Sequence, residues 1–250
     1  MTTPKIALVT GASRGIGAAT ARLLAERGHD VAINYTRNAA AAESVAADVC
    51  ALGRRALLVR ADVADEAAVL AMFQAVDRGL GRLTALVNNA GIVDVKARLD
   101  EMRTDRFRRM LDVNVFGTLL CSREAVKRMS TRYGGAGGAI VNLSSIAASL
   151  GAPSMYVDYA ASKGAIDSFT LGLGRELATE GVRVNAVRPG IIDTEIHAAS
   201  GDAQRAHSSA SIIPMQRPGT ALEIAQAIAW LVSDESGYVT GTVLGVSGGR

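Results

Sequence analysis

Short apolar runs rich in Val, Ile and Leu recur along the chain, separated by longer segments of helical character. The runs are continuously apolar rather than alternating, which is typical of strands covered on both faces. The pattern predicts seven strands, at Ile6–Val9, Val31–Ile33, Ala56–Val59, Leu83–Val87, Ala139–Leu143, Val182–Val187 and Thr242–Val246.

The segments between these runs predict helices, and several end at a glycine, such as Gly28 and Gly53, that can cap a helix in the left-handed conformation. The predicted helices are Gly15–Gly28, Ala39–Gly53, Glu66–Gly79, Thr104–Arg132, Ser154–Glu180 and Thr220–Ser233. Strands that alternate with helices indicate an α/β fold, a doubly wound parallel sheet of seven strands in a three-layer α/β/α arrangement. We interpret the glycine cluster Gly134–Gly138 as a surface turn rather than a linker, so residues 1–250 are expected to form a single domain.

Composition narrows the function classes. Apolar residues make up 49% of the chain and charged residues 20%, which is typical of a globular protein. A net charge of +3 with scattered basic residues argues against a nucleic-acid partner. The densest basic cluster lies within Arg103–Arg109 and is interleaved with acids, as expected of a solvated helix face or a subunit contact. Cys50 and Cys121 lack metal-like spacing, so we expect no metal site and interpret both as buried free thiols in a reducing compartment.

Neither a membrane span nor a targeting segment is expected. No stretch approaches 18 uncharged apolar residues, and Lys5–Thr10 has a strand pattern rather than that of a signal peptide. The default expectation is a cytoplasmic protein without a membrane partner.

A glycine-rich turn, Thr10-Gly-Ala-Ser-Arg-Gly-Ile-Gly17, follows the first strand and opens the first helix. Glycine permits close approach of a ligand, and a helix N-terminus offers free N–H groups and a positive dipole end to phosphates. The spacing is Gly-x-x-x-Gly-x-Gly rather than the Gly-x-Gly-x-x-Gly of the general dinucleotide fingerprint. Its position at the first strand-to-helix turn favours a phosphate site over a purely structural turn.

The end of the second strand bears on the choice of nicotinamide cofactor. An acid there would accept hydrogen bonds from a ribose 2′-hydroxyl, but the strand end has none and Asp30 precedes the strand. Arg37 and Arg14 could converge on a 2′-phosphate, with Asn34 nearby as a donor. This pattern favours NADP(H) over NAD(H), and arginines that are merely solvated are the alternative.

Two polar sites follow the third and fourth strands, at the carboxyl edge where ligands collect. Asp62 could accept a hydrogen bond from an adenine amino group, or it could cap the helix that begins near Asp65. Asn88-Asn-Ala-Gly91 indicates close packing against a ligand or a neighbouring strand.

Tyr159 and Lys163 are four residues apart, so they share one face of a predicted helix. A phenol loses its proton only near pH ~10. A nearby ammonium would stabilise the phenolate and make the pair a proton donor or acceptor. Taken alone, such a pair is also typical of a solvated helix face.

In order and spacing, these motifs together resemble the classical short-chain dehydrogenase/reductase family, including members similar to 3-oxoacyl-[acyl-carrier-protein] reductases. The matching positions cover nearly the whole chain and are Thr10–Gly17, Asp62, Asn88–Gly91, Asn114, Ser145, Tyr159 with Lys163, Pro189-Gly190 and Val239–Gly249. The resemblance implies a Rossmann-like sheet that binds NAD or NADP and an activity that interconverts alcohols and carbonyls.

The resemblance also implies roles for four catalytic residues. Tyr159 would donate a proton to a carbonyl oxygen or remove it from an alcohol. Lys163 would lower the pKa of Tyr159 and bind the nicotinamide ribose. Ser145 would hydrogen-bond the substrate oxygen, and Asn114 would hold a water that links Lys163 to solvent.

Cofactor contacts are implied from the first turn to the loop after the sixth strand. They are Gly11, Ser13, Arg14, Gly15, Ile16, Gly17, Asn34, Arg37, Asp62, Val63, Asn89, Ala90, Gly91, Tyr159, Lys163, Pro189, Gly190, Ile192 and Thr194. The polar segment Glu195–Ser211 that follows is expected to be a substrate lid, within about residues 191–215. Its His197 and His207 are expected to be solvated.

Two departures from the family pattern stand out. Ser145 lies fourteen residues before Tyr159, one more than is common in the family, so the loop Ala147–Val157 should reshape a wall of the substrate pocket. Ser144 competes for the serine role but would lengthen the spacing further. Ser247 stands where many relatives carry an aspartate and is expected to be structural.

The leading hypothesis is an NADP(H)-dependent carbonyl reductase or alcohol dehydrogenase that acts on a small molecule. One alternative is a 3-oxoacyl-[acyl-carrier-protein] reductase, whose acidic carrier could dock on basic residues of the long fourth helix, Arg123, Lys127, Arg128 and Arg132. Another is a non-catalytic NADP-binding sensor or scaffold. An extended-type epimerase or dehydratase is disfavoured, because a separate C-terminal substrate region is lacking.

Substrate and assembly are the least constrained features. Val93, Met155, Tyr156 and Ile192 predict a partly apolar pocket without an obvious charged anchor. A homo-oligomer, a tetramer or a dimer, is expected. Apolar surface for it could come from Met110, Val113, Phe116, Leu119, Leu120, Phe169, Leu171 and Leu173.

Overall fold

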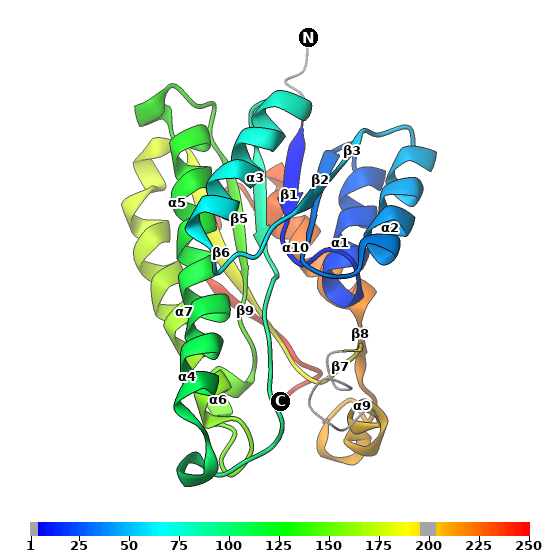
Figure 1. Cartoon of the computed structure of the whole chain (residues 1–250), viewed down its shortest axis with the longest axis vertical. Helices are drawn as coiled ribbons and strands as arrows, with labels where there is room; N and C mark the ends of the chain where they lie inside the picture. Colours follow the sequence, from blue (N-terminus) through cyan, green and yellow to red (C-terminus); the bar gives the residue numbers. More distant parts are fainter. Residues whose placement is uncertain (1–4, 196–203) are drawn as a thin grey trace.

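A seven-stranded parallel sheet forms the centre of the molecule in a computed structural model that describes residues 5–195 and 204–250 (Figure 1). Its order, β3-β2-β1-β4-β5-β6-β9, confirms the predicted doubly wound fold. The strands are β1 Ile6–Val9, β2 Asp30–Tyr35, β3 Ala56–Arg60, β4 Ala85–Asn88, β5 Gly138–Leu143, β6 Val182–Pro189 and β9 Val243–Val246. The winding reverses between β1 and β4, and the crevice beyond their carboxyl ends is where such sheets bind ligands.

Strands β1 to β6 contribute to two cores, one on either face of the sheet, whereas β9 contributes to the first alone. Ala7 and Val9 of β1 belong to one buried cluster, whereas Ile6 and Leu8 belong to the other. Successive side chains of a strand point to opposite faces. Both faces being covered, the strands are continuously apolar in sequence.

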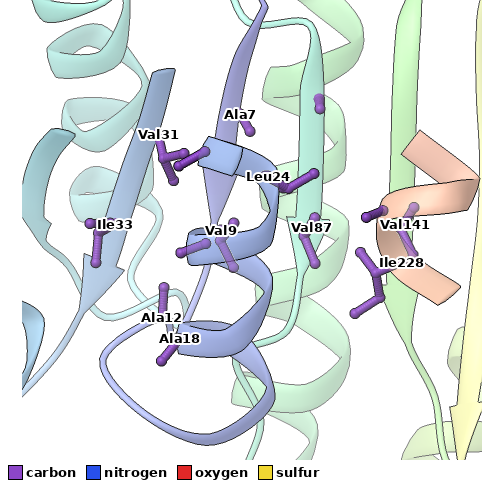
Figure 2. Packing of buried hydrophobic residues seen from close by; sticks show 14 of the residues in the cluster. Ala7, Val9, Ala12, Ala18, Leu24, Val31, Ile33, Val87, Val141 and Ile228 are labelled. Carbon is purple, nitrogen blue, oxygen red and sulfur yellow. The ribbon is translucent and has the colours of Figure 1, made fainter. Parts of the chain in front are cut away.

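Long helices cover the two faces (Figure 1). On one face lie α1 Gly15–Glu26, α2 Ala39–Ala51 and α10 Ala221–Val232; on the other lie α3 Glu66–Gly79, α5 Gly117–Met129 and α7 Val157–Glu176. Figure 2 shows part of the first cluster, in which Leu24 of α1 and Ile228 of α10 pack with Val87 and Val141 of the sheet.

Shorter elements gather mainly at the carboxyl edge of the sheet, at the lower end in Figure 1. They include α4 Thr104–Leu111, α6 Ala147–Leu150, α9 Arg205–Ser208 and a small sheet of β7 Ile192–Asp193 with β8 Gly219–Thr220. Five 3₁₀ turns among the described residues are η1 Leu99–Glu101, η3 Thr131–Tyr133, η4 Ala178–Glu180, η5 Ala210–Ile212 and η6 Asp234–Ser236.

The predicted helix Thr104–Arg132 is interrupted. A π-helical turn, η2 Asp112–Phe116, lies between α4 and α5, and α5 ends at Met129 because Ser130 is extended (ψ 134°). The predicted helix Ser154–Glu180 is also shorter, since α7 begins only at Val157 after Tyr156, whose backbone is not helical (φ −148°). The apolar pattern of the segments did not reveal these limits.

Other expectations need correction. Cys121 is buried but Cys50 is exposed. Arg106 is not a solvated residue of its cluster, since its guanidinium is buried against Asp158 (2.7 Å). Within the described part of the chain, no helix is long and apolar enough to cross a membrane, and no cluster of three metal-ligating side chains occurs.

Candidate active site

The glycine turn after β1 has the conformation that its sequence predicts. Gly11 and Gly15 have positive φ angles of 62° and 54°. A Cβ on Gly17 would lie 2.5 Å from both the Asn89 Nδ2 and the Gly11 carbonyl oxygen, so no side chain fits there. Asn89 Nδ2 also donates to the carbonyl oxygens of Thr10 (2.8 Å) and Gly11 (3.0 Å). The asparagine after β4 therefore ties this turn to the neighbouring strand end.

The start of α1 leaves backbone donors free for an anion. Arg14 is the N-cap and makes no side-chain cap hydrogen bond, and no acid occupies the first helical turn. A Cβ on Gly15 would lie 3.5 Å from the Thr194 side chain, which faces the turn from the loop after β6. An orphan helix N-terminus beside glycines without room for side chains fits the pyrophosphate of a dinucleotide.

The expected 2′-phosphate region is only partly as predicted. Arg14 and Arg37 are exposed, and neither has an acidic partner within residues 5–195 and 204–250. Asn34, however, is a poor candidate to donate to a phosphate, because it is 1% exposed. Its Oδ1 accepts from Gly11 N (3.1 Å) and its Nδ2 donates to Ala61 O (3.0 Å). Asn34 therefore holds the glycine turn in place by hydrogen bonds between the ends of neighbouring strands.

Asp62 neither caps α3 nor is free. Asp65 is the N-cap of α3, and its side chain accepts from Ala67 N. Asp62 Oδ2 accepts instead from Arg109 Nη2 at 3.0 Å. The neighbouring Val63 is a core residue that packs against Gly117.

Tyr159 and Lys163 lie on α7 at the carboxyl edge, as their spacing predicts. Lys163 is 5% exposed, and its Nζ donates to Leu143 O at 2.6 Å and lies 5.6 Å from the centre of the Tyr159 ring. Burial lowers the pKa of Lys163 to about 8. Burial raises the pKa of Tyr159, against which a hydrogen bond with Ser145 and the charge of Arg205 act. The acidifying influence expected from Lys163 thus comes from two other residues.

Ser145 is better placed than Ser144 for the serine role that the resemblance implies. Its hydroxyl is the one that hydrogen-bonds Tyr159, while its Oγ also accepts from Ala147 N (3.1 Å). Ser144 is 3% exposed, and its Oγ donates to Lys163 O (3.3 Å), so it braces the strand end against α7.

Asn114 lies in the π-helical turn, a feature often found at functional sites. Its amide is engaged on both sides, because Oδ1 accepts from Ile92 N (2.8 Å) and Nδ2 donates to Ile92 O (3.0 Å). A Cβ on Gly91 would lie 3.4 Å from Asn114 Oδ1 and 3.6 Å from Lys163 Nζ. Asn114 and Lys163 therefore approach the same glycine from two elements.

These groups surround a cavity of about 350 Å³. Of the residues expected at the cofactor or catalytic site, its wall includes Ile16, Asn89, Gly91, Ser145, Tyr159, Lys163, Pro189, Gly190, Ile192 and Thr194. The other expected residues lie outside its lining, and they are Gly11, Ser13, Arg14, Gly15, Gly17, Asn34, Arg37, Asp62, Val63, Ala90 and Asn114. Gly190 packs closely on the closing segment, where a Cβ would lie 2.7 Å from Ser247 Cα, in keeping with a structural role for Ser247.

The expectation of a pocket without a charged anchor is wrong. Val93, Met155 and Tyr156 do line the cavity, but so do Arg205 and Arg250. No motif marks either arginine, and Arg205 lies in the polar segment that was expected to be a lid. His207 lies 3.8 Å from Asp193, and both side chains are exposed. Residues 196–203 of the expected lid, which include His197, lie outside the described residues.

A phenol, a hydroxyl and an ammonium around one cavity, beside a dinucleotide-type turn, are what a nicotinamide-dependent oxidoreductase requires. Comparison with known proteins supports the assignment to this class of enzyme. A family model described as enoyl-(acyl carrier protein) reductase matches residues 11–250. The uncharacterized oxidoreductase YgfF of Escherichia coli (strain K12) is 54% identical, with 98% of this chain and 99% of that protein covered.

Two other relatives are similar over nearly their full length. A cis-4-hydroxycyclohexanecarboxylate dehydrogenase of Sinomonas cyclohexanicum is 41% identical, covering 98% of this chain and 96% of the relative. A short chain dehydrogenase from Burkholderia cenocepacia J2315, solved in complex with NADP, is 39% identical with a TM-score of 0.90, covering 98% of this chain and 97% of that one. The chain belongs to the classical short-chain dehydrogenase/reductase family.

Proposed function

We propose that the protein interconverts a carbonyl and a secondary alcohol on a small molecule with NADP(H). The observation that carries this proposal is the Ser145–Tyr159 pair at the wall of a partly apolar cavity, with Lys163 one helical turn further along α7. Two neighbouring hydroxyls can hydrogen-bond the same substrate oxygen, as the reduction of a carbonyl requires. The reduction of a carbon–carbon double bond, which the description of the family model suggests, has no oxygen on the reacting carbons.

Each residue has a distinct task. Ser145 donates a hydrogen bond to the substrate oxygen and stabilises the charge that develops on it. Tyr159 Oη gives that oxygen its proton during reduction and takes it back during oxidation. Its raised pKa favours the protonated phenol, which is the form that gives up the proton during reduction. A bound nicotinamide supplies or accepts the hydride.

The cofactor would be held by the elements around the first turn. Backbone N–H groups at the start of α1 would bind its phosphates, with Thr194 on the opposite side. Lys163 would bind the nicotinamide ribose, and Asn114 would keep Ile92 and Gly91 in place beside it and hold the relay water.

A Tyr159→Phe variant tests the proton transfer. Loss of the hydroxyl should reduce kcat for NADPH oxidation with an accepted ketone by about 10²- to 10⁴-fold, with little change in the melting temperature. The panel should contain ketones, 3-oxoacyl thioesters and enoyl thioesters, with unchanged activity of the variant counting against the mechanism.

Preference for NADP(H) is proposed from Arg37 and Arg14, which are exposed and have no acidic partner in the described part of the chain, and from the NADP complex of the Burkholderia relative. Arg37→Asp should shift the ratio of kcat/KM for NADPH over NADH towards NADH by roughly 10-fold or more, because a carboxylate repels the 2′-phosphate and accepts from a 2′-hydroxyl. The matched control is Arg22→Asp on the outer side of α1, which should leave the ratio unchanged. An unaltered ratio in Arg37→Asp would refute the role of this arginine.

Two alternatives have less support. The basic face suggested for an acyl-carrier protein is largely neutralised, since Arg123 pairs with Glu66, Lys127 with Glu124 and Arg128 with Asp77, each at 2.7 Å. Failure to reduce a carrier-bound 3-oxoacyl chain would remove that alternative. A non-catalytic NADP sensor would instead bind NADPH tightly in calorimetry and turn over nothing on the panel.

A further inference from the structure

The cavity carries a positive charge, that of Arg205, to which neither the glycine turn nor the proton transfer assigns a ligand. Arg205, at the start of α9, lines it together with Tyr156 and Tyr159. Its Nη1 donates to Tyr156 Oη at 2.7 Å, and its guanidinium carbon lies 4.9 Å from the centre of the Tyr156 ring. Tyr156 is itself only 5% exposed, so these two contacts hold the guanidinium at a defined place on the wall.

Among the described residues, Arg205 lacks the acidic partner that a charge in a cavity usually has. In the described ranges 5–195 and 204–250 no carboxylate pairs with Arg205, and no Asp or Glu side chain there lines the cavity. A guanidinium has five N–H donors and stays charged at any physiological pH. The contact with the neutral Tyr156 hydroxyl uses one donor and compensates none of the charge.

The surroundings of Arg205 favour a carboxylate as its ligand. Much of the wall is apolar, including Val93, Leu150, Met155 and Ile191, so water screens the charge less than at an open surface. The planar fork of a guanidinium matches a carboxylate through two parallel hydrogen bonds. A phosphate dianion needs more donors than one fork offers, and in this chain such donors lie at the start of α1.

We propose that the substrate is a small oxo or hydroxy acid, whose carboxylate Arg205 binds while Tyr159 and Ser145 hold its reacting oxygen. This inference rests on the carbonyl–alcohol chemistry proposed above. Part of the 350 Å³ would be filled by the nicotinamide, so only a short apolar segment separates the two functional groups of the acid. Arg205 is then the residue that selects acids over neutral ketones and orients the carbonyl towards Tyr159.

Binding without turnover tests this inference. An oxo compound cannot be reduced in the presence of NADP⁺, so calorimetry with saturating NADP⁺ reports binding alone. The probes are 3-oxobutanoate, 4-oxopentanoate, 5-oxohexanoate and 6-oxoheptanoate, each compared with its neutral methyl ester. For at least one chain length the wild type should bind the acid about 10-fold or more tightly than the ester, as expected for a charge-assisted fork.

Variants assign the preference to a residue. Arg205→Met should abolish the preference for the acid over the ester, and Arg205→Lys should restore it in part. The matched control is Arg217→Met, which should retain the preference, because Arg217 lies outside this cavity and pairs with Glu223. Equal or no binding of acids and esters by the wild type, or a preference that survives in Arg205→Met and is lost in Arg250→Met, would overturn the proposal. Acid preference without reduction of any panel ketone would instead refute the carbonyl chemistry and leave the anion site standing.

Discussion

The ammonium of Lys163 is buried in the folded chain, where its Nζ donates to the Leu143 carbonyl and no carboxylate among the described residues contacts it. Burying this ammonium lowers the free energy of unfolding, but it places a positive charge at the active site. The raised pKa of Tyr159 and the lowered pKa of Lys163 have the same main cause, which is burial beside the cavity.

This arrangement makes stability depend on pH. The pKa of Lys163 falls from 10.5 to about 8 on folding, so below about pH 8 both folded and unfolded chains hold the proton and folding bears the full cost of burying it. As pH rises from 8 to 10.5 the folded chain alone loses the proton, and the cost disappears. Lys163→Met should therefore melt at a higher temperature than the wild type at pH 7, and the difference should shrink by pH 10 in calorimetry. A difference that is constant over this range would contradict the shifted pKa.

Among the elements, α7 depends on an ion pair at its first turn. Arg106 of α4 donates to both oxygens of Asp158 (2.7 and 3.1 Å), and its Nη1 donates to Val95 O (2.7 Å). Both side chains are nearly inaccessible, at 8% and 5% exposure. The pair fixes the segment that carries Tyr159 against α4 and against the loop that includes Val93.

Arg106→Met should therefore lower both stability and activity. It leaves Asp158 buried without its partner, which costs about 3–5 kcal/mol of unfolding free energy by urea denaturation. It should also reduce kcat, because Asp158 precedes Tyr159. Arg103→Met on the same helix is the control, since its pair with Asp105 is exposed and should contribute little. Equal effects of the two variants would show that burial of the Arg106 pair is unimportant.

At the scale of the whole molecule, part of the apolar surface expected for assembly is indeed accessible. Met110, Val113 and Leu120 are core residues, whereas Phe116 (46% exposed), Leu119 (37%) and Leu171 (41%) are open to solvent in the single chain. Exposed apolar side chains on η2, α5 and α7 favour a contact between copies of this chain.

A Phe116→Glu, Leu119→Glu double variant tests this contact. Two charges on a helix–helix interface should reduce the mass found by light scattering from a multiple of 25.9 kDa to 25.9 kDa. Leu52→Glu, at an equally exposed site beyond the C-terminal end of α2, should leave the mass unchanged. A wild type that is already monomeric would refute the expected oligomer.

The fold was predictable because burial on both faces of the sheet leaves continuous apolar runs. The first turn was predictable because Gly11 and Gly15 have positive φ angles and Gly17 has no room for a side chain. Local pattern could not show that Asn34 points inwards, since its role depends on β2 lying between β1 and β3 in the sheet. Arg205 was missed for a similar reason. Its meaning comes from Tyr156, a residue 49 positions away in sequence.

The π-helical turn Asp112–Phe116 has a consequence for how this chain can change by insertion and deletion. A π turn holds one residue more than the α-helix around it. Deleting one residue there would restore a regular helix and rotate α4 by about 100° relative to α5. Arg106 would leave Asp158, and Asn114 would leave Ile92. A deletion of one residue inside the turn would therefore make the helix more regular and, at the same time, disorder the active site more than a deletion elsewhere in α4 or α5 would.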